Sequence, residues 1–310
     1  MWDIEVDVAC VGAGVSILGT AMAGIDAGAE VLVASPAAEH EGAGTSVAVK
    51  QQVGGFLRSW SRVDLDVETE QYITAMSEEL APDSEMDDSG RVTVRTVKPV
   101  AADDDTVETF VGSRLSQWSM QCLISPYGMT YSTASGWWTV SQMRASDGQV
   151  LDVQRLGSIN PVELADGNAI NDWMLGQIRA RDIDVRMSSP MERIIFEDGR
   201  IIGVELSTPD GLLAVGVRHG LAVSSRDSFV GQADPVLAPS NSTELQVCLV
   251  GLPASRFLKI ELLDTVADIP VRALCTATGR QLRDGMRESR SMTSGAGRCG
   301  KARRNPASGQ

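Results

Sequence analysis

Three residues near the start of the chain, Gly12, Ala13 and Gly14, have the types and spacing that bind a phosphate group. Glycines let the backbone approach an anion closely, and the N–H groups of a helix that begins beside them can donate hydrogen bonds to it. The third position of the usual glycine pattern is Ile17 here, and the next glycine is Gly19. The turn therefore predicts a dinucleotide site with an imperfect fingerprint.

The residues around this turn predict the elements that position it. We expect a buried strand over 6–11, a helix of small residues over 15–27 and a second strand over 30–34. This order is the first strand-helix-strand unit of a dinucleotide-binding fold. Ser35 closes the second strand, where such folds usually carry an acidic residue that binds a ribose hydroxyl. A serine can supply only part of that contact.

The composition excludes several classes of protein. The chain has 310 residues, 43% of them hydrophobic, and a formal net charge of -14. An acidic surface repels a phosphate backbone, so nucleic acid is not expected as a partner. Five cysteines without CxxC spacing indicate reduced thiols in a cytoplasmic protein. No membrane span is expected, because glycines and the charged Asp26 and Glu30 interrupt the apolar stretch 9–34.

The middle of the chain predicts an inserted α+β region. Helical spacing covers 64–80 and 110–123, and an alternating segment over 91–97 predicts a half-exposed strand. Aromatic residues concentrate in 127–140. They either pack a small sheet or stack on a flat ligand, and the pattern leaves both interpretations open.

The second half of the chain predicts the rest of the dinucleotide fold. An amphipathic helix is expected over 169–181 and a strand over 183–187. Turns at 198–200 and 209–211 predict a three-stranded meander. A strand over 220–224 then returns to the sheet.

The segments VDVACVGAG…DAGAEVLV and NDWMLGQIRARDIDVRMSSPMERIIFEDGRIIGVEL together resemble a known domain. They are similar to the FAD-binding domain of the flavoprotein family that includes fumarate reductase, succinate dehydrogenase and 3-ketosteroid dehydrogenase. The resemblance implies an α/β fold, a Rossmann-like FAD-binding domain with a parallel sheet and a β-meander, plus an inserted α+β region. It also implies FAD as the cofactor. The positions that match the family's FAD contacts are Gly12, Gly14, Ser35, Gly44, Thr45, Ser46 and Met191.

We expect four regions on this basis. Residues 1–60 and 150–230 form the FAD-binding domain, and 61–149 form an inserted lid or substrate region. A C-terminal strand pair and helix occupy 231–292, and a disordered tail occupies 293–310. The chain departs from the family's alanine-threonine-glycine-glycine pattern after the returning strand, where it has Ser224, Ser225, Arg226 and Asp227.

No motif assigns catalytic residues. The two histidines, His40 and His219, are expected in a solvated loop and an exposed turn. Neither a metal site nor a Ser-His-Asp arrangement is predicted from them. Tyr127 and Tyr131 are the candidates for proton donation, because a phenol can serve as a general acid.

Two functional classes remain open. The first is an FAD-dependent oxidoreductase, a dehydrogenase or reductase that acts on a CH–CH bond next to a carbonyl in a small or steroid-like substrate. The second is a degenerate flavoprotein-fold subunit without catalysis, which acts as a structural or regulatory partner. Ile17, Ser35 and residues 224–227 favour the second class. NAD is a third option, although the distant meander segment favours the flavin. A protein partner or a homo-oligomer is compatible with each class.

Overall fold

The computed structural model describes residues 1–36, 66–78, 94–100, 112–134, 140–224 and 242–265. All of these residues belong to one structural unit, Met1–Val271. Several predictions concern residues outside these ranges. They are those for His40, Gly44, Thr45, Ser46, the aromatic residues 137–138, residues 225–227, and the helix and tail expected after residue 265.

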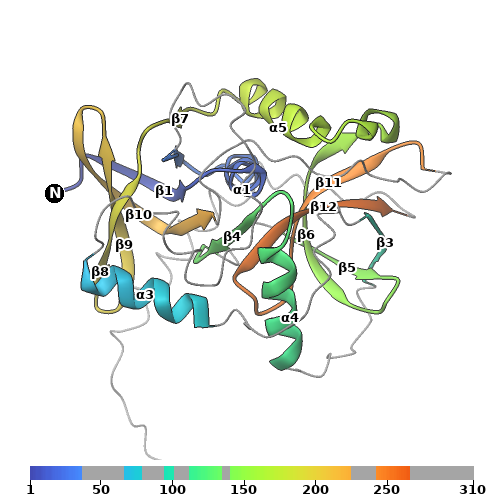
Figure 1. The fold of residues 1–310 in the computed structure, drawn as a ribbon, viewed down its shortest axis with the longest axis horizontal. Coiled ribbons are helices and arrows are strands. Elements are labelled where there is room, and N and C mark those ends of the chain that lie inside the picture. The colour runs from blue at the N-terminus through green and yellow to red at the C-terminus, as the bar shows by residue number, and fades with distance from the viewer. Residues whose placement is uncertain (37–65, 79–93, 101–111, 135–139, 225–241, 266–310) are drawn as a thin grey trace, which may run out of the picture. The chain divides into compact units, whose positions relative to one another are not determined.

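The N-terminal strand-helix-strand unit forms as the sequence predicts. β1 (Ile4–Val11) leads through the glycine turn into α1 (Val15–Asp26), and β2 (Val31–Ala34) lies parallel to β1. α1 consists of small and aliphatic residues because it is surrounded by protein, and every residue from Val15 to Gly24 is buried. It packs against α5 (Ala169–Ala180) and against strands on both sides of β1 (Figure 1).

The strands among the described residues form one 12-stranded sheet. Its first part contains β10 (Gly211–Ser224), β1, β2 and β7 (Val185–Arg186) in that order, all parallel. β8 (Met191–Glu197) and β9 (Arg200–Thr208) precede β10 in an antiparallel meander. The predicted parallel strands and meander are therefore both present.

The second part of the sheet closes into a small ring. It contains β3 (Val94–Pro99), β5 (Ser141–Ala145), β6 (Val150–Ile159), β11 (Leu245–Gly251) and β12 (Phe257–Thr265). The ring closes because β11 pairs with both β6 and β12, while β3 pairs with both β12 and β5. The pair formed by β11 and β12 is predicted by the sequence.

β4 (Met129–Ser132) joins the ring to the parallel part, because it pairs with both β12 and β10. Strands from the expected inserted region and from the expected C-terminal region are thus hydrogen-bonded into the same sheet as β1. The division of the chain into domains stays a prediction.

Helices cover both faces of this sheet. One core cluster contains buried side chains of α1 and α5, and the other contains those of α3 (Val67–Glu78) and α4 (Gly112–Leu123). Figure 1 shows α3 and α4 on the opposite side of the strands from α5. A short 3-10 helix, η1 (Pro161–Ala165), precedes α5. None of the helices in the described ranges has the length and apolar character needed to cross a membrane.

Candidate cofactor and proton-donor site

The glycine turn connects the end of β1 to the start of α1. Gly12 has φ +122° and Gly14 has φ +93°, conformations that a residue with a side chain rarely adopts. Gly14 is the N-cap of α1, which has no side-chain cap hydrogen bond and no acidic residue in its first turn. A helix end of this kind carries a partial positive charge that favours an anion.

Gly12 also has a packing role that the sequence does not reveal. A Cβ atom at this position would lie 2.8 Å from Ser224 Cβ at the end of β10. The Ser224 hydroxyl donates a hydrogen bond to the carbonyl oxygen of Ala13. The close contact between β1 and β10 therefore requires a glycine at position 12 even without a ligand. Of the two glycines, Gly14 is therefore the one whose presence indicates a phosphate site.

Another part of the chain supplies a hydrogen-bond acceptor for one of the backbone N–H groups in the first turn of α1. The backbone N–H of Ser16 donates to the carbonyl oxygen of Tyr127 at 3.2 Å, and Thr130 Oγ1 donates to Ser16 Oγ at 3.0 Å. The first N–H groups of a helix have no partner within the helix. Among the described residues, those of Val15 and Ile17 have no acceptor. These two N–H groups and the Gly14 turn fit one phosphate of a dinucleotide.

Ser35 lies at the end of β2, where the sequence predicts a ribose contact. Its side chain is fully buried. Its N–H donates to Arg186 O at 2.8 Å, and its carbonyl oxygen accepts from Ser189 N at 2.7 Å. Ser35 therefore links the end of β2 to the segment before Met191, the buried first residue of β8. The structure brings these two predicted positions together, and the contact of each with FAD stays a prediction.

Two tyrosines and an arginine come together on the face of the sheet that α3 covers. The hydroxyl oxygens of Tyr72 in α3 and Tyr131 in β4 are 3.3 Å apart, and Arg256 Nη1 donates to Tyr131 Oη at 3.3 Å. The rings of Phe196 and Phe257 lie 5.4 Å from the Tyr72 ring and 5.3 Å from the Tyr131 ring, between centroids. Of these three residues the sequence predicted a role only for Tyr131, since Tyr72 and Arg256 are 59 and 125 residues away from it.

We call these three residues, Tyr72, Tyr131 and Arg256, the tyrosine cluster. Its hydrogen bonds use one of the two phenol protons. A guanidinium can only donate, so Tyr131 Oη accepts from Arg256. One of the two phenol protons lies in the bond between the tyrosines, and the other has no acceptor among the described residues. Burial, together with the hydrogen bond to Tyr131, raises the pKa of Tyr72 above its ordinary value. The raised pKa keeps Tyr72 protonated at neutral pH, so the cluster has a phenol O–H group that can donate a hydrogen bond to a carbonyl oxygen.

β4 connects the tyrosine cluster with the glycine turn. Consecutive residues of a strand point to opposite faces of the sheet. Thr130 reaches Ser16 at the start of α1, whereas Tyr131 reaches Tyr72 of α3. Thr130 pairs with Ser224, the last residue of β10. The cluster thus lies at the same end of the strands as the turn, on the other face.

The other candidate residues from the sequence, a tyrosine, a histidine and three cysteines, lie outside the glycine turn and the tyrosine cluster. Tyr127 is buried beside α1, and burial raises the pKa of its phenol. His219 is exposed as expected, but it lies within the strand β10 and not in a turn, with its Nε2 3.6 Å from Asp7 Oδ1. Cys10, Cys122 and Cys248 are buried free thiols. The described residues contain no group of His, Cys, Asp and Glu side chains that could hold a metal ion.

No family model matches the chain, and no curated protein matches it. Solved structures do match part of it. A flavocytochrome c3 fumarate reductase is 17% identical, with 70% of this chain and 33% of that chain covered and a TM-score of 0.29. A 3-ketosteroid delta1-dehydrogenase from Sterolibacterium denitrificans is 13% identical, with 70% and 47% covered and a TM-score of 0.30.

An aklavinone-11 hydroxylase, solved with FAD and aklavinone, is 19% identical, with 70% and 32% covered and a TM-score of 0.25. The matched part of this chain thus covers less than half the length of each of these proteins. A fumarate reductase and a 3-ketosteroid dehydrogenase, which the sequence resemblance also names, are among them.

Proposed function

We propose that this chain is the FAD-binding part of an FAD-dependent oxidoreductase. The observation that supports this proposal is the strand order β10-β1-β2-β7. The chain passes from β1 through α1 to β2 on one side, while the other neighbour of β1 is β10, which comes much later in the sequence. Dinucleotides bind outside the carboxyl ends of parallel strands at such a switch point.

The expected contacts follow this edge of the sheet in order. Met191 and Ser35 lie beside β7 and β2, and the turn with Gly12 and Gly14 follows β1. β10 and β4 come next, and β4 carries Tyr131. The tyrosine cluster is therefore on the side of the turn away from the expected adenine contact. We propose as further contacts the loop residues Gly44, Thr45 and Ser46, which follow β2 in the sequence.

FAD, when bound, supplies hydride transfer for dehydrogenation or reduction of a CH–CH bond next to a carbonyl. The N–H groups of Val15 and Ile17 would hold one phosphate of the diphosphate. The tyrosine cluster would bind the carbonyl oxygen of a small or steroid-like substrate and donate a proton to it, and Arg256 would support Tyr131 in that role. The apolar rings of Phe196 and Phe257 beside the two phenols suit an apolar substrate.

Flavin content tests this proposal. Purified protein should absorb in the flavin bands and release FAD on denaturation, or take up added FAD if it is purified without it. Colourless protein that fails to bind added FAD would overturn the proposal.

The alternative is a flavoprotein-fold subunit without catalysis, and two observations favour it. The Tyr127 carbonyl oxygen occupies the N–H of Ser16, and the Ser35 side chain is buried. Under this alternative the chain contributes a structural or regulatory surface to a partner or to a second copy of itself. Failure to bind FAD, together with a stable complex in sedimentation experiments, would support this alternative.

A further inference from the structure

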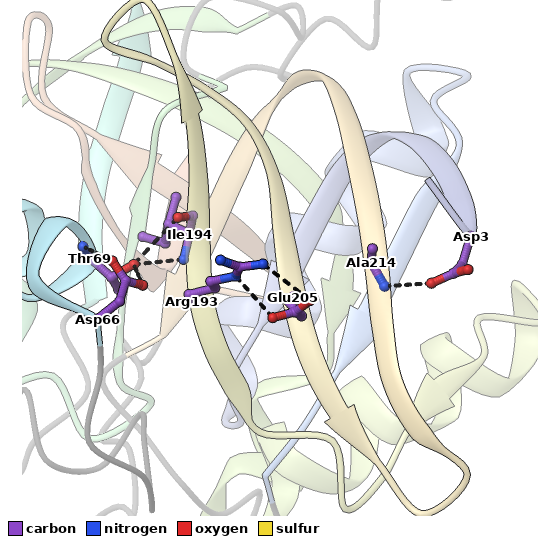
Figure 2. Close-up of polar contacts among 7 residues, drawn as sticks. All are labelled: Asp3, Asp66, Thr69, Arg193, Ile194, Glu205 and Ala214. Carbon is purple, nitrogen blue, oxygen red and sulfur yellow. Dashed lines mark hydrogen bonds and ion pairs between the residues drawn. The ribbon is translucent and has the colours of Figure 1, made fainter. Parts of the chain in front are cut away.

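The first turn of α3 is bound to the outer strand of the meander. Among the described residues β8 pairs only with β9, so the backbone groups on its other edge need partners outside the sheet. Thr69 supplies one of them (Figure 2). The N–H of Ile194 donates to Thr69 Oγ1 at 2.8 Å, and Ile194 O lies 3.4 Å from the same hydroxyl. Thr69 is fully buried.

Asp66 fixes the orientation of this hydroxyl. Its Oδ2 accepts from Thr69 Oγ1 at 2.7 Å, and its Oδ1 accepts from the N–H groups of Glu68 and Thr69 at 3.1 Å. Burial raises the pKa of Asp66, but these hydrogen bonds outweigh it and leave the pKa below its ordinary value. The ionised carboxylate therefore accepts a hydrogen bond from the Thr69 hydroxyl. The lone pairs of the hydroxyl oxygen remain free to accept from the Ile194 N–H.

The meander that receives α3 is braced by its own contacts. Arg193 Nε lies 2.9 Å from Glu205 Oε2 across β8 and β9. On the far side of the meander, Asp3 Oδ2 accepts from the N–H of Ala214 at 2.9 Å (Figure 2). The Thr69 contact therefore joins α3 to a defined edge rather than to a loose strand.

Tyr72 follows Thr69 by three residues and so lies near it on the surface of α3. Its ring contacts Phe196, two residues after Ile194 on β8, and its hydroxyl reaches Tyr131. Ile73 and Met76 also bury α3 against the core. Such apolar contacts are non-directional, however, whereas a hydrogen bond requires a particular position and rotation of the helix.

We propose that Thr69 is a positioning residue, which sets the place of α3 on β8 and thereby holds the Tyr72 hydroxyl against Tyr131. Its importance for proton donation depends on the function proposed above, whereas its effect on the position of Tyr72 does not. Removal of the Thr69 hydroxyl shifts α3 and separates the two phenols.

The test uses the fact that the chain has three tyrosines, Tyr72, Tyr127 and Tyr131. Protein labelled with 13C-tyrosine gives one set of ring signals for each, assigned with single Tyr→Phe variants. In Thr69→Val, which replaces the hydroxyl with a methyl group, the Tyr72 signals should lose their ring-current shift from Phe196. The Tyr131 signals should change as well, and those of Tyr127 should stay. Thr69→Ser should restore the wild-type signals.

Two further variants keep the test decisive. Asp66→Asn retains a cap acceptor but weakens the acceptor for the Thr69 hydroxyl, and it should move the same signals if Thr69→Val does not fold. Val67→Ala, at an exposed position in the same turn, should move none of them. Wild-type Tyr72 and Tyr131 signals in folded Thr69→Val or Asp66→Asn, even with a lower melting temperature, would overturn the proposal.

Flavin content and turnover are measured on the same samples, so that the two proposals fail separately. A wild-type protein without flavin would refute the proposed function and leave the tyrosine signals as a valid test of Thr69. In a flavin-containing protein, Thr69→Val should lower turnover at unchanged flavin content, and Thr69→Ser should recover it.

Discussion

The ion pair of Lys259 and Glu261 is buried between β12 and α4, and loss of its negative charge should destabilise the protein strongly. Glu261 Oε1 lies 2.8 Å from Lys259 Nζ, and Glu261 Oε2 lies 3.2 Å from Arg95 Nε. The side chains of Glu261 and Lys259 are 1% and 5% exposed. Lys259 Nζ also lies 4.9 Å from the centre of the Trp118 ring. Glu261→Gln keeps the shape of the side chain but removes the carboxylate that Lys259 and Arg95 share, while Arg95 retains Asp147 at 3.7 Å.

The expected loss of stability follows from burial. Removing one partner of a buried pair costs about 3–5 kcal/mol, because the other charge remains in the core. Arg193 and Glu205 provide a matched control, since they are 2.9 Å apart but the Arg193 side chain is 52% exposed. Glu205→Gln should therefore cost about 0.2–1 kcal/mol.

Urea unfolding measures both variants. With a slope of about 3 kcal/mol per M, Glu261→Gln should lower the midpoint by about 1–1.7 M and Glu205→Gln by at most about 0.3 M. Circular dichroism and tryptophan fluorescence should give the same midpoints. A Glu261→Gln shift no larger than that of Glu205→Gln would refute the reasoning that burial gives this pair its importance.

Two other predictions concern the N-terminal strand. The Trp2 ring packs directly on the backbone of two glycines of the meander, because a Cβ atom on Gly203 or Gly216 would lie 2.5 Å or 2.8 Å from it. Trp2→Ala removes this packing and should lower the free energy of unfolding, measured in urea, by about 1–3 kcal/mol. A change below 0.5 kcal/mol, on the order of a neutral surface substitution, would show that this packing is unimportant. Burial raises the pKa of Asp7, but hydrogen bonds from Arg218 and from the Glu30 N–H outweigh it and lower the pKa below its ordinary value. Such a carboxylate stabilises the fold above the ordinary pKa and loses that effect as pH falls through the lowered value. Asp7→Asn should therefore show a shallower fall in melting temperature below about pH 4, and an equally steep fall would contradict this assignment.

The sequence was most informative where local pattern determines structure. The glycine turn, the small-residue helix α1 and the parallel β2 follow from residues close together in the chain. The hairpin between β8 and β9 likewise follows from Asp198 and Gly199, whose φ values of 49° and 73° are those of a two-residue hairpin turn.

The ring of β3, β5, β6, β11 and β12 could not be predicted in this way, because strand pairing over long sequence separations leaves no local signal. The same limit applies to the tyrosine cluster. Tyr72 and Arg256 carry no motif, and Tyr72 meets Tyr131 through the packing of α3, whose Thr69 contacts β8. The packing of Gly12 against Ser224 also depends on two segments that are distant in the sequence.

FAD binding by a matched pair of glycine variants tests the central claim most directly. Gly14 and Gly28 both have positive φ values, +93° and +85°, so alanine strains the backbone at either position. Gly14 begins α1 beside the proposed diphosphate, whereas Gly28 follows the other end of the helix, where a Cβ atom would meet open space. In calorimetric titrations, Gly14→Ala should weaken FAD binding by about tenfold or more, while Gly28→Ala should bind like the wild type. Equal FAD affinity in the two folded variants would contradict the assignment of the glycine turn as the diphosphate site.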